Sequence, residues 1–156
     1  MKLRGYILAL LTVSSMTSLA IAQSTLEPTT SERYAPRLGD IMNAVQSRHM
    51  KLWFAGKALN WELAAYELRQ LKAGLLEAAL LYEGIPVTNV TTMTKPLQSL
   101  ADAIDAKDSR RFAVTTGELT DRCNACHRSM QRGFIVIQAP TLSPFGNQVF
   151  TPQKKP

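Results

Sequence analysis

The chain has 156 residues, of which 46% are hydrophobic and 19% charged, and its formal net charge is +6 at pH 7. This length supports one domain with its own core and is too short for two domains of ordinary size. The composition is that of a globular protein, and no basic cluster is interleaved with aromatic residues, so nucleic acid is not an expected partner.

Residues 1–22 have the pattern of a cleaved secretory signal peptide. Lys2 and Arg4 precede the apolar stretch YILALLTV, and AIA at 20–22 supplies small residues for cleavage. The apolar stretch is too short for a stable membrane span, and no later run is long enough, although an uncleaved anchor is the alternative. We therefore expect export to the periplasm. Cleavage removes two of the 18 basic residues and none of the 12 acidic ones, so the mature charge is +4.

Four amphipathic segments follow a polar, flexible lead-in at 23–36. Apolar residues recur in them with a helical period, and Asn60 and either Asp108 or Ser109 are suitable N-caps. GIPVTNVTT is expected to be a loop, with Pro96 in the first turn of the helix after it. The expected helices span about 37 or 40 to 56, 60 to about 83, about 95 to 106, and 108 or 109 to 133.

Short loops between four helices predict an all-α, up-down-up-down four-helix bundle over residues 37–133. Residues 134–156 contain several prolines after Gln138, which favour an extended tail over a fifth helix. The apolar FIVI at 134–137 is expected to pack back on the bundle. Trp53 and Trp61 are expected in the core between helices.

Both cysteines of the chain lie in the five-residue sequence CNACH, as Cys123 and Cys126, directly before His127. C-x-x-C-H is the attachment pattern of c-type haem: each thiol forms a thioether with a haem vinyl group, and a histidine one helical turn beyond the first cysteine reaches the iron. Three alternatives remain at this point: a redox-active dithiol, a zinc site that includes His49, and a plain disulfide. A disulfide across two residues closes almost no loop and stabilises little.

An exported four-helix chain with this motif near the end of its last helix resembles the class II c-type cytochromes, the cytochrome c-prime group and its low-spin relatives. The resemblance covers about residues 37–132, and the tail departs from it. It implies one covalent haem c, with His127 as the proximal iron ligand and the sixth position supplied by the first helix. Family members are often dimers, so it also allows a homodimer.

Met42, His49 and Met50 are the candidates for the sixth position. Met42 and His49 share a helix face about 10 Å apart along the axis, whereas Met50 is turned away from it. Antiparallel packing of the first and last helices favours Met42 opposite His127, with His49 and no protein ligand as alternatives. If His49 is instead a core residue, Glu67 or Tyr66 is its expected partner.

These features predict a monohaem electron carrier that exchanges electrons with protein redox partners, and not an enzyme. An open sixth position would instead give a five-coordinate haem protein that binds nitric oxide or another small gas. At most one of Arg122, Arg128 and Arg132 is expected to pair with a haem propionate, and the others are expected on the solvated face of the helix.

Overall fold

The computed structural model describes residues 35–154 of the chain. In this range it has four α-helices and no β-strand, so the predicted all-α class is confirmed. None of these helices is both long and apolar enough to cross a membrane. The predicted signal peptide and the lead-in up to residue 34 lie outside the described residues. The helices are α1 (Leu38–Lys57), α2 (Trp61–Leu81), α3 (Val87–Asp105) and α4 (Ser109–Ser129).

The N-termini of α2 and α4 are capped as the sequence predicts. The Oδ1 atom of Asn60 accepts the backbone N–H of Leu63 at 3.1 Å. The Oδ1 atom of Asp108 accepts the N–H groups of Arg110 and Arg111 at 3.0 and 2.9 Å. These bonds satisfy donors that have no partner inside the helix, which is why both helices begin there.

The third helix begins earlier than predicted. It starts at Val87, so most of the expected loop is helical and Pro96 lies inside the helix. The missing N–H of Pro96 removes one bond of the helical ladder. Burial offsets this cost, because Met93 (4% exposed) lies one turn before the buried Leu97 and extends the apolar stripe.

The fourth helix ends at Ser129, four residues before the predicted stop at Gly133. Gln131 takes a left-handed conformation with φ 57°. The N–H of Arg132 then donates to the His127 carbonyl at 2.7 Å, which closes the helix end in the Schellman pattern. The turn that reverses the chain therefore begins at Met130, three residues after His127.

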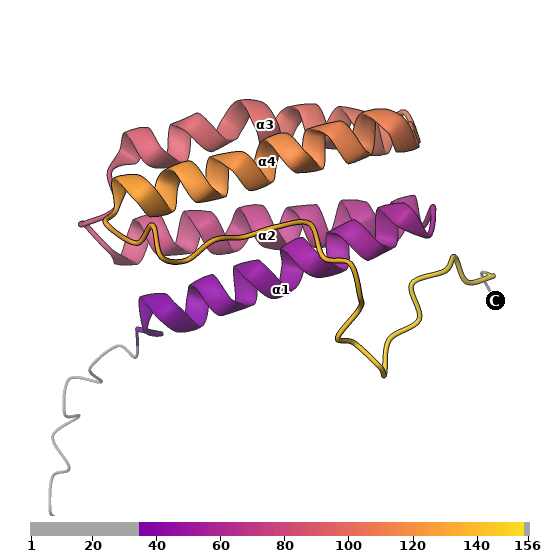
Figure 1. The fold of residues 1–156 in the computed structure, drawn as a ribbon, viewed down its shortest axis with the longest axis horizontal. Helices are drawn as coiled ribbons and strands as arrows, with labels where there is room; N and C mark the ends of the chain where they lie inside the picture. The colour runs from indigo at the N-terminus through magenta and orange to yellow at the C-terminus, as the bar shows by residue number, and fades with distance from the viewer. Residues whose placement is uncertain (1–34, 155–156) are drawn as a thin grey trace, which may run out of the picture. The chain divides into compact units, whose positions relative to one another are not determined.

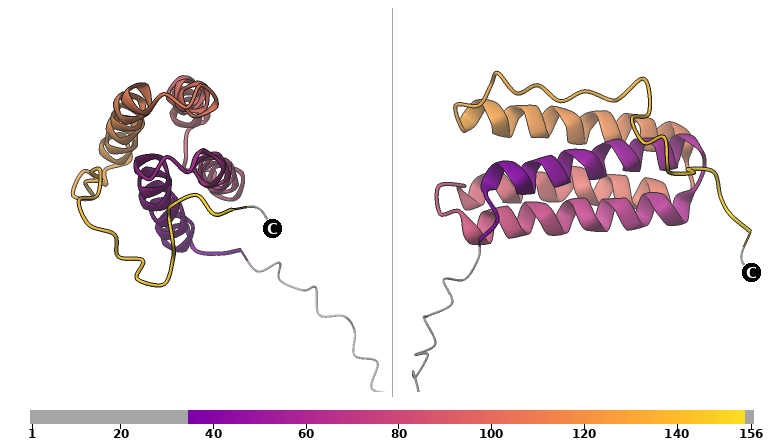
Figure 2. Two further views of the ribbon diagram at one scale, coloured as in Figure 1. Left: turned by 90° about the vertical axis from the view of Figure 1, so that its right-hand side faces the viewer. Right: turned by 90° about the horizontal axis from the view of Figure 1, so that it is seen from below.

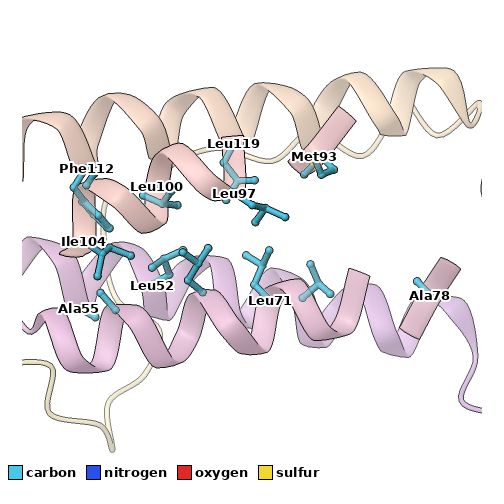
Figure 3. Packing of buried hydrophobic residues seen from close by; sticks show 14 of the residues in the cluster. Leu52, Ala55, Leu71, Ala78, Met93, Leu97, Leu100, Ile104, Phe112 and Leu119 are labelled. Atoms are coloured by element: carbon cyan, nitrogen blue, oxygen red, sulfur yellow. The ribbon is translucent and has the colours of Figure 1, made fainter. Parts of the chain in front are cut away.

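The helices form two pairs, with α3 and α4 on one side and α1 and α2 on the other (Figure 1). The apolar faces of the two pairs meet in one core (Figure 3). At one end, the buried Phe112 ring stacks on Trp53 (centroids 6.3 Å apart) and meets Trp61 edge-on (5.8 Å), as expected for core tryptophans. Gly56 touches this ring so closely that an added Cβ would overlap it.

Residues 130–154 form neither helix nor strand and run back along α4 before crossing to α1 (Figures 1 and 2). Near the end of this segment the Phe150 ring packs against Phe54 of α1, with centroids 5.6 Å apart. The Nζ atom of Lys51 lies 4.8 Å from the centroid of Phe145. Both of these contacts are made with α1.

Candidate functional site

Cys123, Cys126 and His127 lie on the last two turns of α4. Both thiols are free and half-buried. Cys123 packs against the hydrophobic core, and burial raises the pKa of its thiol to about 11. Burial also raises the pKa of Cys126. The two thiols are therefore neutral, whereas redox-active dithiols have a lowered thiol pKa, so the structure does not favour a redox-active dithiol.

The His127 ring is oriented by the segment after α4. Its Nδ1 atom lies 2.9 Å from the carbonyl oxygen of Ile135. Because a carbonyl only accepts hydrogen bonds, Nδ1 carries the proton and the lone pair is on Nε2. A histidine with Nδ1–H bonded to a backbone carbonyl is in the form that binds a metal through Nε2.

Asn124, between the two cysteines, was not predicted to have a role. Its Nδ2 group donates to the Ile137 carbonyl at 2.8 Å, and its Oδ1 atom accepts the Ile137 N–H at 2.7 Å. The backbone of the FIVI segment is thus bound to α4, but the side chains of Phe134 and Val136 are 78% and 73% exposed. The expected packing of these two side chains on the bundle is wrong.

His49 is a buried residue of α1 that bonds to α4. Its Nε2 atom lies 2.8 Å from Thr120 Oγ1, and that hydroxyl donates its own proton to the Thr116 carbonyl at 2.8 Å. Thr120 must therefore accept from His49, so Nε2 carries the proton. The prediction that Glu67 or Tyr66 is the hydrogen-bond partner of His49 is therefore wrong.

The other ring nitrogen of His49, Nδ1, is buried and has no hydrogen-bond partner among the described residues. Burial lowers the pKa of His49, which keeps the ring neutral. His49 and Met50 also line a cavity of about 240 Å³ between α1 and residues 136–140.

The bond between His49 and Thr120 aligns α1 with α4. Helix α1 begins on the side of the structure where α4 ends (Figure 1), so the two helices run in opposite directions. His127 is seven residues after Thr120, and Met42 is seven residues before His49. Met42 therefore lies at the level of His127, half-buried against the core.

The donor set fits haem c better than zinc. Among residues 35–154, no three His, Cys, Asp or Glu side chains are close enough to hold a metal ion, and His49 is bonded to Thr120, so a zinc site shared with CNACH is not assembled. Haem needs fewer protein donors, because the porphyrin supplies four nitrogens. Two free thiols and one imidazole nitrogen meet its requirement.

Two of the arginines near the motif line an open cavity of about 460 Å³ between α3 and α4. Two acidic side chains, Glu118 and Asp121, line the same cavity. Pairing of an arginine with a propionate therefore stays a prediction. The lining residues are Lys95, Pro96, Glu118, Asp121, Arg122, Ala125 and Arg128.

None of the family models, curated proteins or solved structures compared with this chain matches it. Its function is therefore inferred from the geometry of the site.

Proposed function

We propose that the protein is an exported monohaem c-type cytochrome that carries electrons between protein redox partners. The observation that carries this proposal is the arrangement at the end of α4, where two free thiols accompany an imidazole whose Nδ1–H is held by Ile135. Cys123 and Cys126 would form the thioethers, and His127 Nε2 would hold the iron on the proximal side. When bound, haem c supplies an iron that cycles between Fe(III) and Fe(II).

The proposed architecture is an up-down-up-down bundle with an extended tail, as in the class II cytochromes that the sequence resembles. The protein's own contribution is to anchor the cofactor, orient the proximal imidazole and exclude water with the core on which Cys123 packs. The protein makes and breaks no substrate bond in this role. Its proposed location is the periplasm, and its mild positive charge suits acidic redox partners.

Met42 is the proposed distal ligand. It lies at the level of His127, whereas His49 Nε2 is already bonded to Thr120 two helical turns away. A thioether opposite an imidazole is a normal ligand pair in electron-transfer cytochromes.

A five-coordinate haem protein that binds a small gas is the second candidate. The observation that favours it is the packing of the Met42 side chain against the core. A methionine that stays in the core leaves the sixth position open to a gas.

Optical and EPR spectra of the full chain, expressed with a haem-attachment system, distinguish the two candidates. A low-spin haem that does not bind carbon monoxide, with a methionine–iron charge-transfer band, supports the electron carrier. Met42→Leu should then give a high-spin haem that binds carbon monoxide. Met50→Leu, a half-buried methionine on the same helix, is the control and should change neither property. A wild-type ferrous haem that binds carbon monoxide at once would contradict the electron carrier and favour gas binding.

A further inference from the structure

The segment after α4 is held to the helix by its backbone. Asn124 makes two hydrogen bonds with Ile137, one to the carbonyl and one from the N–H. This is the pair of bonds that one strand residue makes with a neighbouring strand, so a single side chain fixes the register of the segment along the helix.

The same segment supplies the partner of His127. Ile135, two residues before Ile137, accepts the His127 Nδ1–H at 2.9 Å, and its own N–H donates to the Arg132 carbonyl at 2.8 Å. Residues 132–137 therefore form a short bracket, closed by the helix-end turn on one side and by Asn124 on the other.

Apolar burial does not explain how the bracket is held. Phe134 and Val136 point largely into solvent, at 78% and 73% exposure, and Ile135 is 41% exposed. Isolated extended segments with exposed side chains do not stay ordered by themselves, because the entropy cost of fixing each residue is about 1–2 kcal/mol. The bracket is therefore held by hydrogen bonds, from the Ile135 N–H to the Arg132 carbonyl at one end and between Asn124 and Ile137 at the other.

We propose that Asn124 is a positioning residue for the proximal iron ligand. By holding Ile137, it keeps the Ile135 carbonyl on His127 Nδ1, which fixes the ring orientation and leaves the Nε2 lone pair for iron. A hydrogen bond from the distant ring nitrogen makes an imidazole a stronger donor to a metal. A stronger donor stabilises Fe(III) over Fe(II), so the bracket lowers the reduction potential. This role rests on the proposed haem function.

The test compares Asn124→Ala with Asn147→Ala in the full haem-loaded chain. Asn147 is an exposed asparagine farther along the same segment, so its replacement controls for a general change in the tail. Hydrogen exchange at the Ile137 amide reports the bracket itself, and the reduction potential with the ferric EPR spectrum reports the ligand. Asn124→Ala should speed exchange at Ile137 about tenfold, on the order of one lost hydrogen bond, and should raise the potential. Asn147→Ala should do neither.

A second variant keeps the CNACH sequence intact in case Asn124→Ala impairs haem attachment. Of the two bonds between Asn124 and Ile137, Ile137→Pro removes the one from the Ile137 N–H to Asn124 Oδ1, and it should raise the potential in the same direction. Faster exchange with an unchanged potential and EPR spectrum would show a merely structural role and overturn the proposal, as would unchanged exchange at Ile137 in Asn124→Ala. A wild-type chain without haem is a different result: it would refute the haem function, and with it any positioning role.

Discussion

Replacing Thr120 by valine tests the contact that aligns α1 with α4. Valine has nearly the same shape as threonine but lacks the hydroxyl, which accepts from His49 Nε2–H and donates to Thr116. The variant leaves His49, at 2% exposure, with no partner on either ring nitrogen. A buried donor without a partner costs about 1–3 kcal/mol, so the free energy of unfolding should fall by about that amount.

Thr115→Val is the matched control in urea unfolding of the full chain at neutral pH. Thr115 is equally buried, but its hydroxyl donates only to carbonyls of its own helix, Arg111 and Phe112. Its loss should cost less than about 1 kcal/mol. Adding His49→Leu to Thr120→Val should recover stability, because both partners are then apolar. If Thr120→Val costs no more than Thr115→Val, the contact does not hold in solution, and the placement of Met42 opposite His127 loses its basis.

Three further predictions concern stability, each measured by urea unfolding. Burial lowers the pKa of His49 below its ordinary value of 6.5, so the unfolded chain binds a proton at a higher pH than the folded chain does. The free energy of unfolding should therefore fall as the pH drops below 6.5, by at most about 1.4 kcal/mol per pH unit. His49→Leu should reduce this slope. Gly56→Ala should destabilise by about 1–3 kcal/mol through overlap with a buried ring, whereas Gly117→Ala, with open space around its Cβ, should stabilise by about 0.5–1 kcal/mol; equal effects would contradict the packing. Arg48 forms an ion pair of 3.1 Å with the carboxylate of Glu67, which is 2% exposed. Arg48→Met should lower the free energy of unfolding by about 2 kcal/mol or more, because it leaves this buried carboxylate without its partner. Glu67→Gln should cost less.

Local sequence signals predicted the parts of the fold that local interactions determine. The helical period and the capping side chains of Asn60 and Asp108 act within a few residues, so α2 and α4 begin where expected. The start of α3 was missed because Pro96 and the threonines before it are poor helix formers by themselves. Burial of Met93, which depends on the other helices, outweighs that preference.

In the candidate site, too, the features set by neighbouring residues were predicted, and those set by contacts between distant residues were not. Cys123, Cys126 and His127 were identified because their chemistry lies within five consecutive residues. The contacts that orient His127 and align Met42 join positions 8 and 71 residues apart, as Ile135 with His127 and His49 with Thr120. Periodicity carries no information on such side-chain bonds.

The mass of the purified full chain after denaturation and acid–acetone extraction tests the central claim most directly. Free haem is removed by this treatment, whereas thioether-bound haem stays with the polypeptide. The proposed function predicts one haem retained per chain, on the peptide that contains Cys123 and Cys126, and loss of this retention when both cysteines are replaced by alanine. A colourless chain whose mass shows two unmodified thiols, after expression with a haem-attachment system, would contradict it.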